Sequence, residues 1–105
     1  MEQRVYERFQ VALPTRVEVV SSGGEQVFEA RTRDISARGA FLHTRDALPE
    51  GSRVRLDFTV ESERISKLTG SQGLIRVEGT VVRSTPEGIA IRFDRESRIL
   101  GSRAS

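Results

Sequence analysis

The segment 34-DISARG-39 places two short polar side chains and a glycine directly before an apolar run. Near the N-terminus stand two arginines, Arg4 and Arg8. Arginine carries a planar fork of donors that pairs with phosphate oxygens and stacks on aromatic rings. A carboxylate repels phosphate, but Asp34 can accept two parallel hydrogen bonds from the N1–H and N2–H2 edge of guanine. These residue types point to a guanine nucleotide with exposed phosphates.

Ser36 and Gly39 suit the same ligand. Ser36 offers a hydroxyl donor or acceptor, and Gly39 allows the ligand to approach the backbone closely. A structural interpretation competes with this one, in which Asp34 and Ser36 cap a turn and the arginines are solvated. The residues alone leave both interpretations open.

Alternation of apolar and polar residues with period two predicts about six strands and almost no helix. It is clearest in 53-RVRLDFTVE-61, whose apolar residues all point to one face. Pro14 indicates an edge strand or a bulge, and Gly79 a bend or a bulge. The other strands are expected at 9–20, 27–35, 40–44, 75–83 and 89–93. Short strands joined by Gly- and Pro-containing turns predict an all-β fold, either an antiparallel barrel or a sandwich.

The first predicted hairpin brings the polar residues together. If its turn lies at Gly23 and Gly24, the residue numbers of two paired positions add up to about 47. Arg8 then lies roughly opposite Gly39, and a bulge would shift this pairing by one or two residues. The span from Arg4 to Arg8 covers at most about 14 Å. Both arginines can therefore converge on one anionic ligand beside Asp34.

The sequence resembles the PilZ domain family, bacterial receptors for cyclic diguanylate (cyclic di-GMP). The segment 4-RVYER-8 matches the family's RxxxR motif, and 34-DISARG-39 matches its DxSxxG motif. The segments 48-LPEGSRVRLDF-58 and 79-GTVVRSTPEGIAIRF-93 resemble later strands, so the likeness spans residues 4 to 94. One departure is Gly88-Ile89-Ala90, where family members often have Gly-x-Gly. It is expected on the outward face, away from the two motifs.

The resemblance implies a six-stranded antiparallel β-barrel, usually followed by a helix. In this chain it implies a single domain, with a flexible ligand-binding segment at 1–8, a barrel at 9–94 and a short helix or tail at 95–105. It also implies roles for five residues. Arg4 and Arg8 would bind phosphates and stack on guanine. Asp34 and Ser36 would contact a guanine edge or the ribose-phosphate. Gly39 would give close backbone contact.

Composition excludes several other functions. The 105 residues form one domain without cysteine and with a net charge of only +2, although 16 of the 17 basic residues are arginine. No apolar stretch is long enough to insert in a membrane, and no secretory signal is present, so we expect a cytoplasmic protein. Aromatic residues make up only 6% of the chain, and Phe41, Phe58 and Phe93 are expected in the core, which argues against nucleic acid as a partner.

The expected function is the binding of cyclic di-GMP by a sensor that signals to a partner protein. Catalysis is not expected, because His43 is the only histidine and no catalytic set or metal-ligand spacing accompanies it. No cofactor is expected apart from the ligand itself. The alternative is an adaptor with the same fold that binds only protein. Whether one or two ligands bind, the oligomeric state and the process served, such as motility or exopolysaccharide synthesis, stay open.

Overall fold

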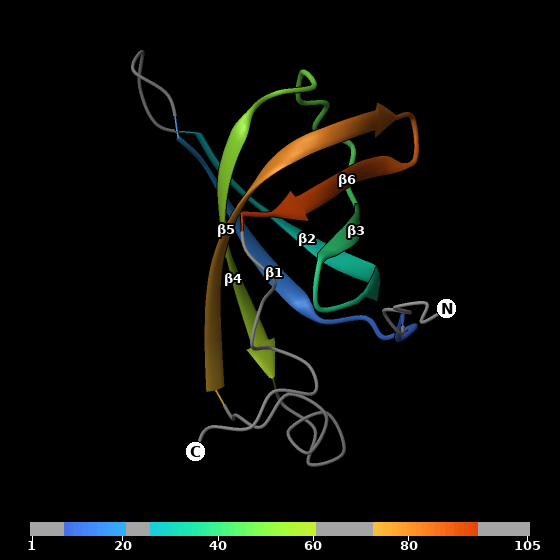
Figure 1. Cartoon of the computed structure of the whole chain (residues 1–105), viewed down its shortest axis with the longest axis vertical. Helices are drawn as coiled ribbons and strands as arrows, with labels where there is room; N and C mark the ends of the chain where they lie inside the picture. Colours follow the sequence, from blue (N-terminus) through green and yellow to red (C-terminus); the bar gives the residue numbers. More distant parts are fainter. Residues whose placement is uncertain (1–7, 21–25, 61–72, 95–105) are drawn as a thin grey trace, which may run out of the picture.

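The computed structural model describes residues 8–20, 26–60 and 73–94, which form a closed antiparallel barrel of six strands (Figure 1). Its strands follow one another around the barrel in the order β1-β2-β3-β6-β5-β4. The predicted all-β barrel is confirmed. The predicted helix at 95–105 lies outside the described residues. The strand bounds are β1 Pro14–Val20, β2 Gln26–Ile35, β3 Gly39–His43, β4 Arg53–Val60, β5 Gly73–Thr85 and β6 Gly88–Phe93.

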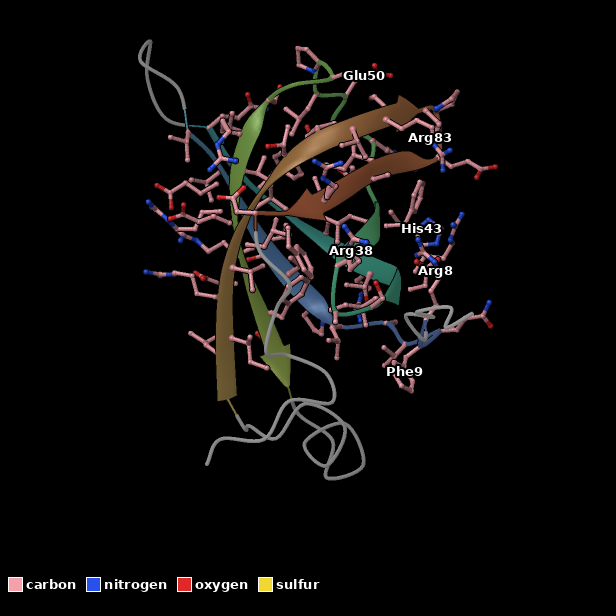
Figure 2. All side chains as sticks on the ribbon, in the orientation of Figure 1. Arg8, Phe9, Arg38, His43, Glu50 and Arg83 are labelled. Atoms are coloured by element: carbon pink, nitrogen blue, oxygen red, sulfur yellow. The ribbon has the colours of Figure 1, made fainter. Side chains whose placement is uncertain are left out.

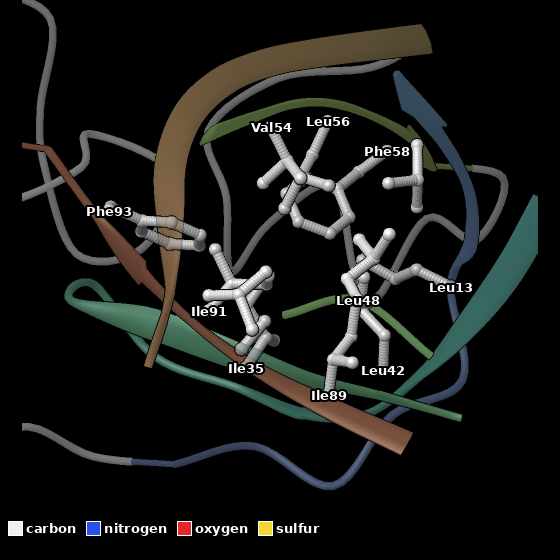
Figure 3. Close-up of a cluster of buried hydrophobic side chains, with 13 residues drawn as sticks. Leu13, Ile35, Leu42, Leu48, Val54, Leu56, Phe58, Ile89, Ile91 and Phe93 are labelled. Atoms are coloured by element: carbon white, nitrogen blue, oxygen red, sulfur yellow. The ribbon is translucent and has the colours of Figure 1, made fainter. Parts of the chain in front are cut away.

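The barrel interior is filled by apolar side chains of the strands, joined by Leu13 and Leu48 from the connecting segments (Figure 3). In β4, Val54, Leu56 and Phe58 are at most 1% exposed, as their alternation with polar residues predicts. Phe58 meets Phe93 edge to face, with ring centroids 6.3 Å apart. Burying a side chain of this size stabilises the fold by about 1.5–3 kcal/mol. The core therefore makes the barrel a rigid support for side chains on its outer surface.

The first strand is shorter than the sequence predicts. It begins at Pro14, because residues 9–13 run beside β2 without a regular ladder. The Thr32 hydroxyl replaces ladder bonds there, accepting from the Leu13 amide at 2.8 Å and donating to the Val11 carbonyl. Further out, Phe9 and Ile35 exchange two backbone hydrogen bonds of 2.8 and 3.0 Å. Pro14 stands at the first position of a strand, where its missing amide is tolerated, so the predicted edge or bulge is wrong.

The register of the first hairpin differs by two residues from the expected one. The residue numbers of paired positions in β1 and β2 add up to 45, as in Val17 opposite Phe28, and not to 47. For the bridge between Phe9 and Ile35 the residue numbers add up to 44. Arg8 is consequently placed beside the end of β2 and the start of the following turn, still within reach of the DISARG segment.

Two bulges interrupt the barrel. In β2 the register shifts between Thr32 and Asp34, and in β5 it shifts between Val81 and Arg83. The extra residues are Arg33 and Val82. Of the bend or bulge expected at Gly79, the bulge is wrong: Gly79 pairs regularly with Phe93, and a Cβ there would overlap the Arg92 carbonyl oxygen. That glycine is required by the close approach of β5 to β6.

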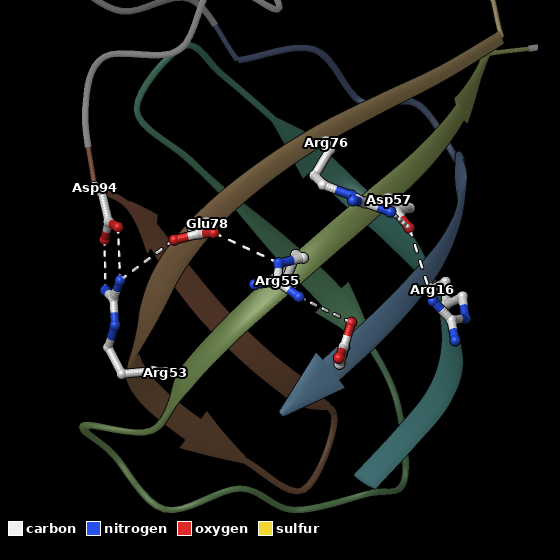
Figure 4. Close-up of polar contacts among 8 residues, drawn as sticks. Arg16, Arg53, Arg55, Asp57, Arg76, Glu78 and Asp94 are labelled. Carbon is white, nitrogen blue, oxygen red and sulfur yellow. Dashed lines mark hydrogen bonds and ion pairs between the residues drawn. The ribbon is translucent and has the colours of Figure 1, made fainter. Parts of the chain in front are cut away.

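Away from the bulges, β1, β4 and β5 carry a ladder of ion pairs on their outer face (Figure 4). Arg53 donates two hydrogen bonds to the Asp94 carboxylate, of 2.5 and 2.7 Å. Asp57 accepts two hydrogen bonds from Arg76, at 2.7 and 3.2 Å, and lies 3.9 Å from Arg16.

In the described ranges, no helix is long and apolar enough to cross a membrane.

Candidate functional site

A groove of about 530 Å³ lies on the outer surface of the barrel, across the four consecutive strands β2, β3, β6 and β5. Figure 2 shows Arg8, Arg38 and Arg83 on this flank of the molecule. Among the residues that the structure describes, five arginines and one carboxylate, that of Asp34, line it, so positive charge is in excess there. Small or apolar residues form the rest of the lining. The arginines are Arg8, Arg33, Arg38, Arg83 and Arg92.

Asp34 pairs with two of the arginines that line the groove. Its carboxylate accepts a hydrogen bond from Arg8 Nη1 at 2.6 Å on one oxygen and from Arg33 Nε at 2.9 Å on the other. The Asp34 side chain is 8% exposed, while the side chains of Arg8 and Arg33 are 64% and 46% exposed. One buried anion thus holds two guanidinium groups that still face solvent, an arrangement suited to binding a second anion.

The bulge in β2 explains how two consecutive residues reach the same site. In a regular strand the side chains of Arg33 and Asp34 would point to opposite faces of the sheet. Because Arg33 is the extra residue of the bulge, both side chains stand on the outer face, opposite Phe41. No alternation pattern in the sequence reveals this bulge.

Ser36 begins the tight turn that joins β2 to β3. Its amide donates to the Gly39 carbonyl at 2.8 Å, and its hydroxyl oxygen accepts from the Arg38 amide at 3.2 Å. The hydroxyl also donates to the Gly39 carbonyl at 3.4 Å. The turn-capping interpretation therefore holds for Ser36, which also lines the groove, but not for Asp34.

Gly39 lines the groove and has a structural reason to be glycine. A Cβ built there would overlap the carbonyl oxygen of Ile91 on the neighbouring strand β6. The close approach that the sequence suggested for a ligand is therefore made by protein backbone. The structure brings Arg8, Asp34, Ser36 and Gly39 together, while Arg4 lies outside the described residues.

Phe41 is buried, as predicted, but it lies outside the core. Its neighbours Ala40 and Leu42 point into the barrel, so the Phe41 ring stands on the outer face of β3. The Arg33 guanidinium carbon lies 4.0 Å from the ring centroid. His43 is exposed and meets the same ring edge to face at 6.0 Å. An aromatic ring covered by an arginine is thus part of the groove wall.

Comparison with known proteins agrees with this geometry. Residues 2–102 match the PilZ domain family. The chain belongs to the PilZ domain family. No curated protein matches the sequence significantly.

Two solved structures share the fold of this PilZ domain. The PilZ domain of CeSA from a cellulose-synthesizing bacterium superimposes with a TM-score of 0.62 at 14% identity, covering 87% of this chain and 83% of the other. The inhibitor of motility MotI/DgrA from Bacillus subtilis gives 0.63 at 19% identity, covering 92% of this chain. This chain spans 45% of the length of MotI/DgrA. At these identities the likeness concerns the fold.

The PilZ domain has groove residues that sequence reasoning missed. Arg92 and Ala90 alternate with the buried residues of β6, so the period-two pattern does place them outside. Ala90 pairs with Phe41 and lines the groove, so this departure from Gly-x-Gly touches the site, contrary to expectation. Arg83 could not be found, because only the closed strand order and the bulge at Val82 bring it to the groove.

Proposed function

We propose that this PilZ domain is a receptor for cyclic di-GMP, which binds in the groove over β2, β3, β6 and β5. The observation that carries the proposal is the contact between the two sequence motifs, in which Arg8 of RxxxR pairs with Asp34 of DxSxxG at 2.6 Å. The ligand has two phosphate groups and two guanine bases, and so needs both cations and flat surfaces. The arginine-rich lining offers both.

The proposed roles follow from the positions in the groove. Arg8, with Arg4, binds phosphate oxygens and stacks on guanine. Both oxygens of Asp34 already accept from arginines, so its main role is to orient them, and a remaining lone pair can meet a guanine edge. Ser36 and Gly39 hold the β2–β3 turn that forms the floor.

The domain acts by binding and not by catalysis. The contacts that Arg4 and Arg8 make with the bound ligand change a surface that a partner protein reads in the cytoplasm. A protein adaptor without nucleotide binding is the competing function. The excess of arginine around Asp34 favours the receptor, because a pure adaptor has no need of a groove with this charge.

Isothermal titration of the purified protein with cyclic di-GMP tests the proposal, with GTP and cyclic di-AMP as controls. Saturable binding of cyclic di-GMP alone, at nanomolar to low-micromolar Kd, is expected, and the fitted stoichiometry gives the number of ligands. Absence of binding by a folded protein, shown by a cooperative thermal transition that the ligand does not shift, would favour the adaptor.

A further inference from the structure

The guanidinium of Arg33 is held in place on two sides. Its Nε donates to Asp34 at 2.9 Å, which fixes one edge. Its Cζ lies over the ring of Phe41, 4.0 Å from the ring centroid. Phe41 is itself 4% exposed and cannot move aside easily. A long side chain that normally samples many rotamers is therefore oriented before any ligand arrives.

Arg33 stands between two hollows. It lines the large groove, and with Phe41 it also lines a second hollow of about 330 Å³ toward the β5–β6 turn. That hollow is completed by Arg83, Thr85, Pro86 and Glu87. The Arg33 side chain is 46% exposed although Phe41 and Asp34 cover part of it. The exposed part is thus available to a ligand that extends from the groove into the second hollow.

We propose that a purine base of the ligand stacks on the face of the Arg33 guanidinium opposite Phe41 and occupies the second hollow. Arg33 then lies between the base and the phenyl ring and is a ligand-binding residue outside both sequence motifs. The identity of the base as guanine rests on the proposed function. Stacking is compatible with the hydrogen bond from Nε to Asp34, because it uses the flat face of the guanidinium and not its N–H donors.

A flat cation of this kind has a specific advantage over a lysine. A guanidinium offers a π-face as well as charge, whereas an ammonium group offers only charge. Arginine contributes a cation–π interaction where bases stack on it. The prior orientation by Asp34 and Phe41 reduces the entropy lost when the base binds.

Titration of the full chain with cyclic di-GMP tests this assignment, comparing wild type with Arg33→Lys, Arg33→Ala and the control Arg31→Ala. Arg31 is an exposed residue of the same strand and lines neither hollow. We expect Arg33→Lys to raise Kd roughly ten-fold although it keeps the charge, Arg33→Ala to raise it at least as much, and Arg31→Ala to change it less than about two-fold. Wild-type affinity in Arg33→Lys would overturn the stacking, as would tighter binding by Arg33→Ala.

A second measurement reports the stack directly. The Nε–H signal of Arg33, identified by its loss in Arg33→Lys, should move upfield when cyclic di-GMP is added, because a base above the group adds a ring-current shift. A signal that stays in place at saturation would contradict the proposal while leaving the proposed function intact. Failure of the wild-type protein to bind at all would instead overturn the proposed function, and this assignment with it.

Discussion

The guanidinium of Arg8 lies 2.6 Å from the carboxylate of Asp34, a residue 26 positions later in the chain. The backbone bridge between Phe9 and Ile35, the residues directly after each of them, sets this distance. Arg8 of the first motif and Asp34 of the second therefore lie side by side, because β2 carries both the bridge and the aspartate. The Arg8 side chain, 64% exposed, contributes to the surface and little to the core.

We expect Arg8→Ala to raise the Kd for cyclic di-GMP about 10- to 100-fold, because a hydrogen bond to a charged group contributes about 1.5–3 kcal/mol. The thermal midpoint of the protein without ligand should change little, since an exposed ion pair contributes at most about 1 kcal/mol. Titration calorimetry and a thermal melt measure the two effects. Arg45→Ala is the matched control, because Arg45 is exposed and lines neither hollow. Wild-type affinity in the Arg8→Ala variant would show that Arg8 does not bind the ligand.

Asp34→Asn separates two roles of the carboxylate by the direction of its effect. If the groove were only a pool of positive charge, removing its one negative residue would tighten the binding of an anion. We expect weaker binding instead, by roughly ten-fold, because Arg8 and Arg33 lose the partner that orients them. Titration at two salt concentrations measures this, with Asp46→Asn in an exposed loop as control. Tighter binding by Asp34→Asn would show that orientation is unimportant.

The strands of this barrel were predictable because one face of each strand lies against the core, so apolar and polar residues alternate along its sequence. The run from Arg53 to Val60 follows that pattern and is β4. The pattern also assigned Phe41 to the core, and it failed there for a physical reason. Phe41 is hidden from water by Arg33 on the outside of the barrel, and a sequence does not distinguish burial under an arginine from burial inside the sheet.

The site was predictable only in part. Asp34, Ser36 and Gly39 are close in sequence and share one turn, so their proximity needed no long-range information. The contribution of β5 and β6 depends on barrel closure, because β6 lies between β3 and β5. Arg83 reaches the groove through that arrangement and through a bulge that no residue pattern marks.

We expect Gly39→Ala to destabilise the fold by about 1–3 kcal/mol, the usual effect of overpacking, because the new Cβ would overlap the Ile91 carbonyl oxygen. Urea unfolding measures the change. Gly88→Ala makes the same kind of overlap, with the Leu42 carbonyl oxygen, and its Cβ would also lie 2.8 Å from Cε1 of Phe41 in the groove wall. We expect both variants to lose stability and to bind cyclic di-GMP more weakly. Unchanged stability of Gly39→Ala would refute the close approach of β3 and β6.

Asp57 gives a prediction for acid stability that is independent of the ligand. The hydrogen bond from Arg76, assisted by the charges of Arg76 and Arg16, holds the pKa of Asp57 below its ordinary value of 3.8, against the opposing effect of burial. A carboxyl whose pKa is lowered by folding stabilises the protein above its unfolded-state pKa, and this contribution disappears as pH falls through the folded-state pKa. Asp57→Asn should therefore cost about 1 kcal/mol at neutral pH, a value kept small by the exposure of both arginines.

The pH profile distinguishes this charge effect from a packing effect. Urea unfolding of wild type and Asp57→Asn between pH 7 and pH 2 should give a difference that is constant down to about pH 4 and shrinks below it. Asp46→Asn, a change of the same kind in an exposed loop, should leave the free energy of unfolding within about 0.5 kcal/mol of wild type at neutral pH. If the difference between wild type and Asp57→Asn stayed constant to pH 2, the substitution would be acting through packing, and the ion pair with Arg76 would contribute nothing to stability.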